Sequence, residues 1–241
     1  MGEMIGRLDI SPDPTALARK VAEWMAVTAL GSSGPFRISL SGGSTPKTLY
    51  GLLASDAFRN RFPWDRAIWY WGDERFVPYD HPESNYRMTR EAMLSKVPAP
   101  LRNIHPVPTD GPPEEAALRY ERTLQQDYGA AVLEPARPLF DITLLGLGPD
   151  GHFASLLPGE PVLEERKLWV AAVAHGRPET RITMTYPAIE SSRRVAFLVA
   201  GKEKAAILGA IRAGSSQVPA ARLKPVGELI WFADLAAAAG P

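Results

Sequence analysis

The 241-residue chain contains no cysteine and carries 27 basic and 27 acidic side chains, so its formal net charge is zero. These numbers exclude disulfides and thiolate metal sites, and they argue against nucleic acid or an anionic membrane as a partner, because no basic field is available. We expect one α/β domain over residues 1–241 and a cytoplasmic protein, because no signal-peptide pattern or membrane-length apolar run is visible.

Expected helices and strands alternate along the sequence. Apolar residues at helical spacing predict a first helix at 14–30, and short apolar or alternating runs predict strands. Strands are expected at 36–40, 67–71, 104–107, 140–145, 168–174, 181–185, 195–199 and 229–232, and further helices at 47–54, 84–94, 114–128 and 205–213. Residues 175–178 are expected to form a loop, 219–223 a connection and 234–239 a frayed tail. This alternation favours βαβ units on a largely parallel sheet.

A glycine turn, SGGSTP at 41–46, follows the strand expected at 36–40. Glycines let a ligand approach the backbone, Ser44 or Thr45 can cap the next helix, and Pro46 suits its first turn. The free amides of such a helix start attract phosphate. An ordinary tight turn with a cap explains the same residues, so anion binding is one of two interpretations.

Three charged residues, Asp73, Glu74 and Arg75, follow the strand expected at 67–71. They are typical of a solvated loop. A loop leaving a strand end beside the glycine turn would also help to wall a pocket, so both interpretations stand.

The stretch 139–159, LFDITLLGLGPDGHFASLLPG, reads as a buried strand that delivers a glycine-rich turn and then His152. Asp150 is expected to cap a short helical turn beginning near Gly151 and ended by Pro158. The imidazole would then lie where strand, loop and helix start meet, which is where open α/β sheets place their chemistry.

The same letters satisfy the pattern G-x-G-x-x-G, which is typical of dinucleotide-binding turns. A dinucleotide fold needs a full helix after the third glycine and an acidic residue at the end of the next strand. Pro158 cuts the helix short, and the strand expected at 168–174 contains no Asp or Glu. Nicotinamide binding is therefore disfavoured.

Three long motifs together resemble the signature set of the 6-phosphogluconolactonase family: SLSGGSTPKTLY at 39–50, WGDERFVPYDHPESNYRM at 71–88 and LLGLGPDGHFASLLPG at 144–159. RITMTYPAI at 181–189 and GKEKA at 201–205 are similar too, so the resemblance covers nearly the whole chain. It implies a Rossmann-like, largely parallel sheet with helices on both faces. The implied activity is hydrolysis of 6-phospho-D-glucono-1,5-lactone to 6-phosphogluconate in the pentose phosphate pathway, without an organic cofactor.

The glucosamine-6-phosphate deaminases share this fold and are the competing interpretation. In their matching motif a glutamate stands five residues after the histidine and partners it in ring opening. That position is Leu157 here, and a leucine cannot orient or charge an imidazole. The resemblance therefore favours the lactonase. A non-catalytic sugar-phosphate-binding regulator is the other alternative.

Site residues follow partly from this resemblance. His152 is the expected general base, Asp150 steers the imidazole or only caps, and amides of the 148–151 turn are candidate oxyanion donors. The resemblance places the phosphate on the Gly43, Ser44 and Thr45 amides and on three cations, which are Arg75, Arg181 and Lys204. Lys202 is an alternative to Lys204.

Four further expectations complete the predicted site. Asp73 and Asn85 are expected to shape the pocket or to meet sugar hydroxyls. Gly151 is counted with the substrate-binding residues. We expect no metal, because no His, Asp and Glu grouping has ligand spacing. His105, beside Pro106, is interpreted as structural. We expect a monomer or a small homo-oligomer.

Overall fold

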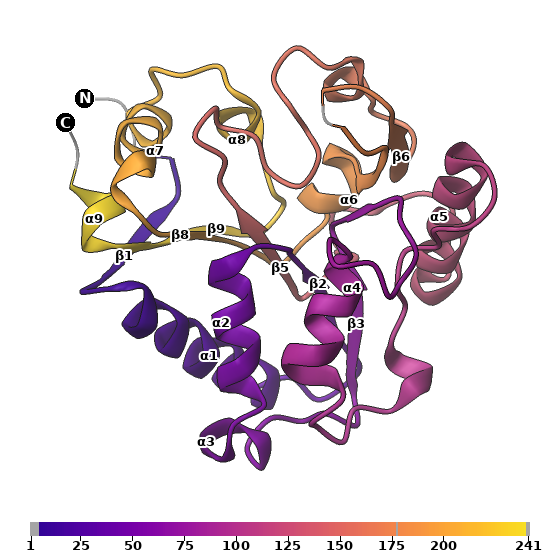
Figure 1. Cartoon of the computed structure of the whole chain (residues 1–241), viewed down its shortest axis with the longest axis horizontal. Coiled ribbons are helices and arrows are strands. Elements are labelled where there is room, and N and C mark those ends of the chain that lie inside the picture. Colours follow the sequence, from indigo (N-terminus) through magenta and orange to yellow (C-terminus); the bar gives the residue numbers. More distant parts are fainter. Residues whose placement is uncertain (1–4, 177, 240–241) are drawn as a thin grey trace.

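The computed structural model describes residues 5–176 and 178–239 of the chain. Arg177, in the loop expected at 175–178, lies outside the described residues. Two sheets organise the fold (Figure 1). The larger has six strands in the order β1-β9-β8-β5-β2-β3, and every neighbouring pair is parallel. Its strands are β1 (Arg7–Ser11), β2 (Phe36–Leu40), β3 (Ala67–Trp71), β5 (Ile142–Gly146), β8 (Arg194–Val199) and β9 (Glu228–Asp234).

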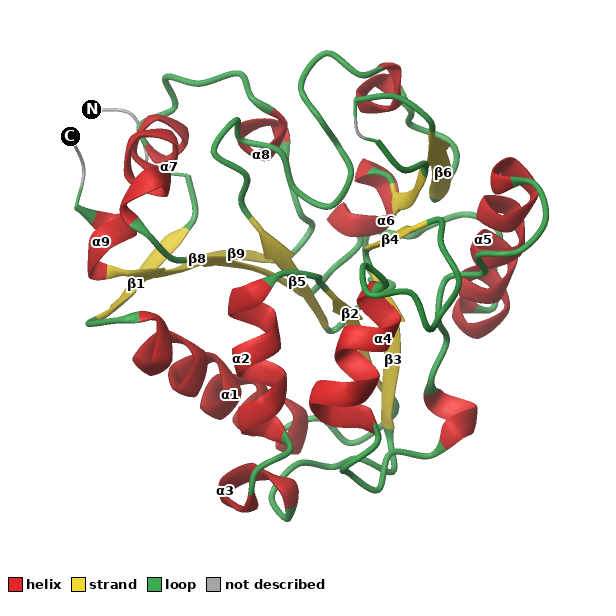
Figure 2. Ribbon diagram, viewed as in Figure 1, coloured by secondary structure: helices red, strands yellow, loops and turns green. Residues whose placement is uncertain are grey.

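Helices cover both faces of this sheet, as Figure 2 shows. On one side lie α1 (Pro14–Leu30), α2 (Ser44–Leu53) and α4 (Asn85–Thr89), which continues as a π-helical turn at Arg90–Leu94. On the other side lie α6 (Tyr186–Glu190), α7 (Ala205–Arg212), α8 (Pro219–Arg222) and α9 (Leu235–Ala238). This confirms the α/β class and the largely parallel sheet with helices on both faces.

The smaller sheet is antiparallel, in the order β4-β7-β6. It consists of β4 (Asp73–Arg75), β7 (Arg181–Met184) and β6 (Val170–Val173), and α5 (Pro113–Tyr128) packs against it. The strand β4 begins two residues after β3 ends, so the chain steps directly from one sheet to the other. Short helices α3 (Asp56–Arg59), η2 (Leu101–Asn103), η3 (Pro161–Glu164) and η4 (Lys202–Lys204) fill connections.

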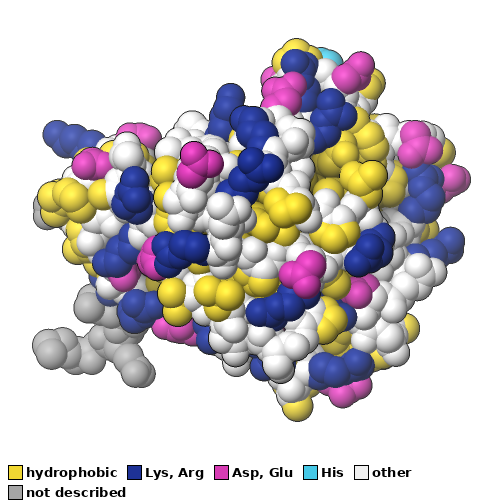
Figure 3. Space-filling model, turned by 90° about the horizontal axis from the view of Figure 1, so that it is seen from below, with side chains coloured by type: hydrophobic (Ala, Val, Ile, Leu, Met, Phe, Trp, Pro, Cys, Tyr) yellow, Lys and Arg dark blue, Asp and Glu magenta, His cyan; other side chains and the backbone are white. Residues whose placement is uncertain are grey.

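Strands of the large sheet are buried by helices on both faces, which explains why they read as apolar runs. Trp71 and Trp231 are fully buried, and the Phe197 and Trp231 rings stack with centroids 4.2 Å apart. Within the described residues no helix combines the length and the apolar character needed to cross a membrane. The face seen in Figure 3 mixes Lys and Arg with Asp, Glu and hydrophobic side chains, in keeping with the zero net charge.

Several local predictions are wrong. No helix forms over 151–159, because Gly151 (φ 79°) and Ala154 (φ 47°) adopt left-handed backbone conformations that interrupt a helix. Asp150 is therefore not a helix cap. The charged residues 73–75 form a strand, not a solvated loop.

Other differences concern the rims of the large sheet. The strand expected at 104–107 is reduced to one bridge between Ile104 and Trp69, since Pro106 has no amide to extend the ladder. The connection at 219–223 contains α8, and the tail expected at 234–239 contains α9, capped by the Asp234 side chain. The strand β1 and the helix α3 were not predicted; β1 is an edge strand in which three of the five residues, RLDIS, are charged or polar.

Candidate functional site

The loops that carry the sequence motifs meet at the carboxyl ends of four adjacent strands. They follow β8, β5, β2 and β3, which are neighbours in that order. From β2 the chain continues to β3 on one side, and it later adds β5, β8 and β9 on the other side. The two glycine loops after β2 and β5 therefore flank the point where strand order reverses, which is where open α/β sheets bind ligands.

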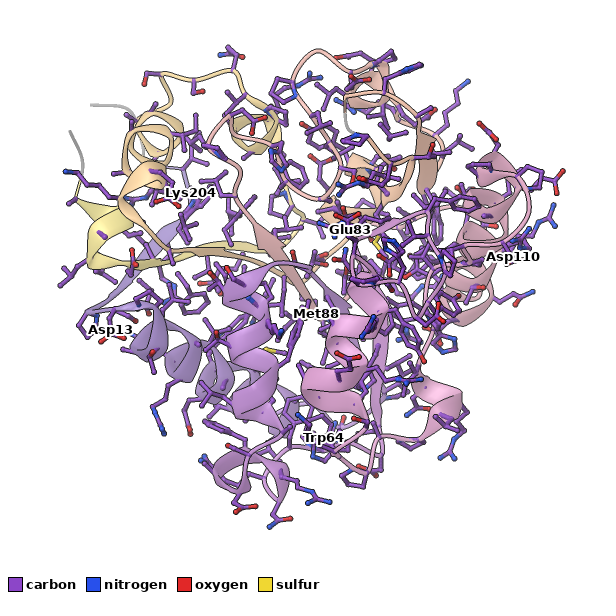
Figure 4. The ribbon with its side chains drawn as sticks, in the orientation of Figure 1. Asp13, Trp64, Glu83, Met88, Asp110 and Lys204 are labelled. Carbon is purple, nitrogen blue, oxygen red and sulfur yellow. The ribbon has the colours of Figure 1, made fainter. Side chains whose placement is uncertain are left out.

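A pocket of about 260 Å³ lies at this point. The residues that line it come from these four connections and from the start of β7, and they include most of the predicted site: Gly43, Asp73, Arg75, Asn85, Gly148, His152, Arg181 and Lys204. Figure 4 labels Lys204 and Glu83, which lie in this view on either side of the loop after β5. The pocket is thus walled by residues from both sheets.

His152 pairs with Asp150 across this loop. Its Nδ1 lies 2.5 Å from Asp150 Oδ1, and its backbone amide donates to the same oxygen at 3.2 Å. Partial burial opposes ionisation of the carboxyl, but the hydrogen bonds from the ring and the amide of His152 outweigh it and lower the pKa of Asp150. Because Nδ1 faces a carboxylate it is the donor, which leaves Nε2 as the acceptor.

The glycines of this loop give the imidazole its space. A Cβ on Gly148 would lie 2.0 Å from His152 Nδ1 and 2.5 Å from Asp150 Oδ1, so only glycine fits. The Gly148 amide donates to the His152 carbonyl at 2.8 Å, and the Gly151 amide donates to the Gly148 carbonyl at 3.0 Å. Both amides are therefore engaged within the turn, and the prediction that they are oxyanion donors is wrong for these two.

Gly151 serves the loop and not the pocket wall. A Cβ there would lie 2.3 Å from Val218 Cγ2, and its carbonyl accepts from the Ala220 amide at 3.0 Å. It therefore ties the His152 loop to the start of α8. Gly151 does not line the pocket, so this geometry does not support its prediction as a substrate-binding residue.

Two arginines face the pocket from the small sheet. Arg75 and Arg181 stand directly opposite one another in the antiparallel pairing of β4 with β7. Like charges in this position repel each other, and the Asp73 and Glu179 carboxylates, 3.9 and 3.7 Å from the Arg181 guanidinium, offset part of that repulsion. Arg75 donates to the Glu83 carbonyl at 2.6 Å, while its Nε is buried without a partner among the described residues.

Asp73 links the loop that holds His152 to the strands that hold the two arginines. It accepts from Ser155 Oγ at 2.7 Å, and its carboxylate lies 3.9 Å from the Arg181 guanidinium. Ser155 was not predicted, because nothing near it in sequence signals a partner 82 residues away. The sequence expectation that Asp73 shapes the pocket fits these contacts.

The glycine turn after β2 presents backbone to the pocket. Gly43 has φ 105° and stands at the N-cap of α2, where no side chain caps the helix, so the predicted capping by Ser44 or Thr45 is wrong. Of the three residues predicted to bind phosphate through their amides, Gly43 lines the pocket and Ser44 and Thr45 do not. In the described part of the chain neither the Ser44 nor the Thr45 amide donates a hydrogen bond, so the start of α2, next to Gly43, offers free amides to an anion.

Of the two candidate lysines, Lys204 lines the pocket and Lys202 is exposed outside it. No carboxylate pairs with Lys204 among the residues described. It adds a third cation beside the arginine pair in a protein with zero net charge, so positive charge is concentrated at this pocket.

A larger hollow of about 440 Å³, around Trp169 and Glu190, lies near the amino ends of β5, β8 and β9. It contains neither a glycine turn nor a histidine, so the chemistry is assigned to the smaller pocket. Among the described residues no group of three His, Cys, Asp or Glu side chains is placed to hold a metal ion.

A family model described as glucosamine-6-phosphate isomerases/6-phosphogluconolactonase matches residues 12–231, which is most of the chain. The chain belongs to this family. A 6-phosphogluconolactonase from Nostoc sp. is 41% identical over 240 residues, covering 96% of this chain and 97% of its own. One from Synechocystis sp. is 45% identical over 211 residues, covering 86% and 85%.

Two solved structures show the same architecture. A 6-phosphogluconolactonase from Thermotoga maritima matches with TM-score 0.81 at 30% identity, over 95% of this chain and 99% of that one. A monomeric glucosamine-6-phosphate deaminase matches with TM-score 0.82, over 97% and 99%, but at 20% identity. The second likeness shows the fold alone.

A second lobe of about 210 Å³ adjoins the pocket. The two share four lining residues, which are Arg75, His152, Ala154 and Arg181. Leu157 lines this lobe and is buried. The position where the deaminase motif carries its glutamate is therefore beside the histidine in space, and here it offers only an apolar wall.

Proposed function

We propose that the protein hydrolyses 6-phospho-D-glucono-1,5-lactone to 6-phospho-D-gluconate, the lactone-opening step of the oxidative pentose phosphate pathway. The observation that carries this proposal is one pocket in which His152, paired with Asp150 at 2.5 Å, faces a cross-strand arginine pair and Lys204. A base and a phosphate-sized cluster of positive charge are what a phosphorylated lactone requires. The names of the relatives, 6-phosphogluconolactonases at 41% and 45% identity, support the same reaction.

In the proposed mechanism His152 is the general base. Its Nε2 takes a proton from water as the oxygen attacks the lactone carbonyl, because Nδ1 is already bonded to Asp150. Asp150 holds the ring in that tautomer and stabilises the imidazolium that forms. Collapse of the tetrahedral intermediate breaks the ring C–O bond, and the imidazolium returns the proton to the departing alkoxide.

The phosphate is assigned to Arg75, Arg181, Lys204 and the free amides at the start of α2. Arginine forks onto phosphate oxygens while lysine acts as a point charge, and the helix start adds backbone donors. Arg75 Nε, buried without a partner among the described residues, gains an acceptor when an anion binds. Asp73 and Asn85 hold this wall in place and border the sugar.

The test is a coupled assay on freshly generated 6-phosphogluconolactone, measured above the spontaneous rate of ring opening. We expect turnover of this lactone and none of glucosamine-6-phosphate, because Leu157 provides no carboxylate to assist ring opening. Turnover of the amino sugar alone would establish a deaminase. Binding of sugar phosphate with no turnover of either substrate would establish a regulator.

A further inference from the structure

Glu74 is a buried carboxyl at the back of the pocket wall. It lies between Asp73 and Arg75 on β4, and successive side chains of a strand point to opposite faces. Asp73 and Arg75 line the pocket, whereas Glu74 does not and is only 1% exposed. The mechanism above leaves this residue without a role.

Four donors converge on the Glu74 carboxylate. One oxygen accepts from the amides of Arg75 at 2.8 Å and Asn85 at 2.7 Å. The other accepts from the Tyr86 amide at 2.8 Å and the Ser84 hydroxyl at 3.1 Å. Three of these donors belong to the first residues of α4 and its cap, so Glu74 fastens the start of α4 to β4.

This attachment sets two residues of the pocket. Once α4 is held, the Asn85 side chain donates to the Asp73 carbonyl at 3.0 Å and packs against Gly42, where a Cβ would lie 2.1 Å from Asn85 Oδ1. Glu83, which directly precedes the Ser84 cap of α4, accepts a hydrogen bond from Arg75 at its carbonyl, at 2.6 Å. The positions of Arg75 and Asn85 therefore depend on the same anchor.

We infer that Glu74 is a positioning residue for substrate binding: its carboxylate fixes Arg75 and Asn85 in the pocket and thereby sets the affinity for the phosphorylated substrate. This inference rests on the proposed function and deepens it. Glu74 is not itself a catalytic residue, because it does not line the pocket.

Only a carboxylate fits this position. All four neighbours donate, and a glutamine has one accepting oxygen and one NH₂ group that would face two donors. Burial, together with the nearby Asp73 charge, raises the pKa of Glu74, while hydrogen bonds from the Tyr86, Asn85 and Arg75 amides oppose that rise. The four donors favour the carboxylate over the neutral acid and oppose the cost of burying the charge.

A second buried glutamate provides a matched control. Glu121 on α5 is 8% exposed and accepts from the Trp169 and Val170 amides at 2.7 and 3.1 Å. It thus fastens the start of β6, at the end of the small sheet opposite Arg181, which pairs with Val173. Glu121→Gln makes the same chemical change at another buried carboxylate that accepts from backbone amides, away from the pocket; its second oxygen accepts from the Gln125 side chain at 3.2 Å.

The experiment compares Glu74→Gln, Glu74→Asp and Glu121→Gln by lactonase kinetics, by thermal unfolding and by calorimetric titration with inorganic phosphate. We expect Glu74→Gln to raise KM and the phosphate Kd roughly tenfold, with a smaller change in kcat, because two of four hydrogen bonds are lost. Glu74→Asp keeps the charge and should recover part of the affinity. Glu121→Gln should lower Tm and leave KM unchanged.

Equal KM for wild type and Glu74→Gln would overturn the inference, as would an equal rise in Glu121→Gln, since that would mark a general effect of lost stability. If Glu74→Gln does not fold, Glu74→Asp decides: unchanged phosphate Kd in a folded protein counts against positioning. A wild-type protein without lactonase activity would instead remove the proposed function, and the phosphate titration separates the two failures.

Discussion

The two sheets contribute differently to the site. The parallel sheet supplies backbone and a base: its strand ends place the Gly43 turn and the Gly148–His152 loop beside the point where strand order reverses. The antiparallel sheet supplies charge, because β4 and β7 set Arg75 opposite Arg181. The difference teaches that the base belongs to the parallel sheet and the arginine pair to the antiparallel sheet, while Lys204 and the start of α2 add phosphate donors from the parallel sheet. Changes to the base and to the arginine pair should therefore have separate effects.

The largest effect is expected at the base. His152→Ala should lower kcat by about 10²–10⁴-fold, because the positioned proton acceptor is lost, with only a modest change in KM. His105→Ala is the control: His105 stacks on Tyr70 with ring centroids 5.0 Å apart, outside the pocket, and should leave kcat intact. Near-normal kcat in His152→Ala would assign the base elsewhere.

The next largest effect is expected at the arginine pair of the antiparallel sheet. Arg75→Ala and Arg181→Ala should each raise KM for the phosphorylated lactone roughly ten- to a hundredfold, since hydrogen bonds to charged groups contribute about 1.5–3 kcal/mol. An unphosphorylated lactone should be affected far less. Arg61→Ala, at an exposed ion pair with Glu23, is the control. An unchanged preference for phosphorylated substrate would move the phosphate to another site.

The same division decides what the sequence could reveal. The strands of the parallel sheet were predicted because burial on both faces makes them apolar runs, and the glycines and His152 follow them within a few residues. The edge strand β1 was missed because it is partly exposed and carries charges. The helical turn at Gly151 was predicted wrongly because the sequence does not display the positive φ at Ala154.

The antiparallel sheet was harder to predict from the sequence. Arg75 and Arg181 were assigned to the phosphate through family resemblance, whereas their cross-strand register depends on a pairing that no local pattern encodes. Glu74 was seen only as one of three charges in a loop. Strand alternation would have placed it behind the pocket, but recognising residues 73–75 as a strand required the tertiary structure, because charged residues rarely form a buried strand.

A smaller effect concerns Asp150, which orients the base in the loop after β5. Asp150→Asn should lower kcat roughly tenfold, because the imidazolium that forms during proton transfer loses its negative partner. Hydrogen bonds from His152 outweigh partial burial and lower the pKa of Asp150 below its ordinary value of 3.8. A kcat equal to that of the wild type would reduce Asp150 to a structural role in the turn.

The lowered pKa also fixes the direction of a stability effect. The pKa of Asp150 is lower in the folded state than in the unfolded chain, so its contribution is complete above pH 3.8 and is lost as pH falls through the lowered value. Wild type and Asp150→Asn should therefore differ in Tm at neutral pH and converge in strong acid. Divergence on acidification would contradict this assignment.

The smallest effect is expected at the contacts between the loop after β5 and the antiparallel sheet. Ser155, in the loop after β5, donates to Asp73 on β4 at 2.7 Å, and its amide donates to Thr183 Oγ1 on β7 at 3.3 Å. Ser155→Ala should lower Tm by roughly 3–6 °C, corresponding to about 1.5 kcal/mol, and reduce kcat/KM a few-fold. Ser192→Ala removes buried hydroxyl bonds to Thr143 and the Ile189 carbonyl, away from the pocket, and serves as the control. It should lower Tm without changing kcat/KM. Equal kinetics in the two variants would mean that His152 and the arginine pair are positioned independently. The Ser155–Asp73 contact between the two sheets would then make no contribution.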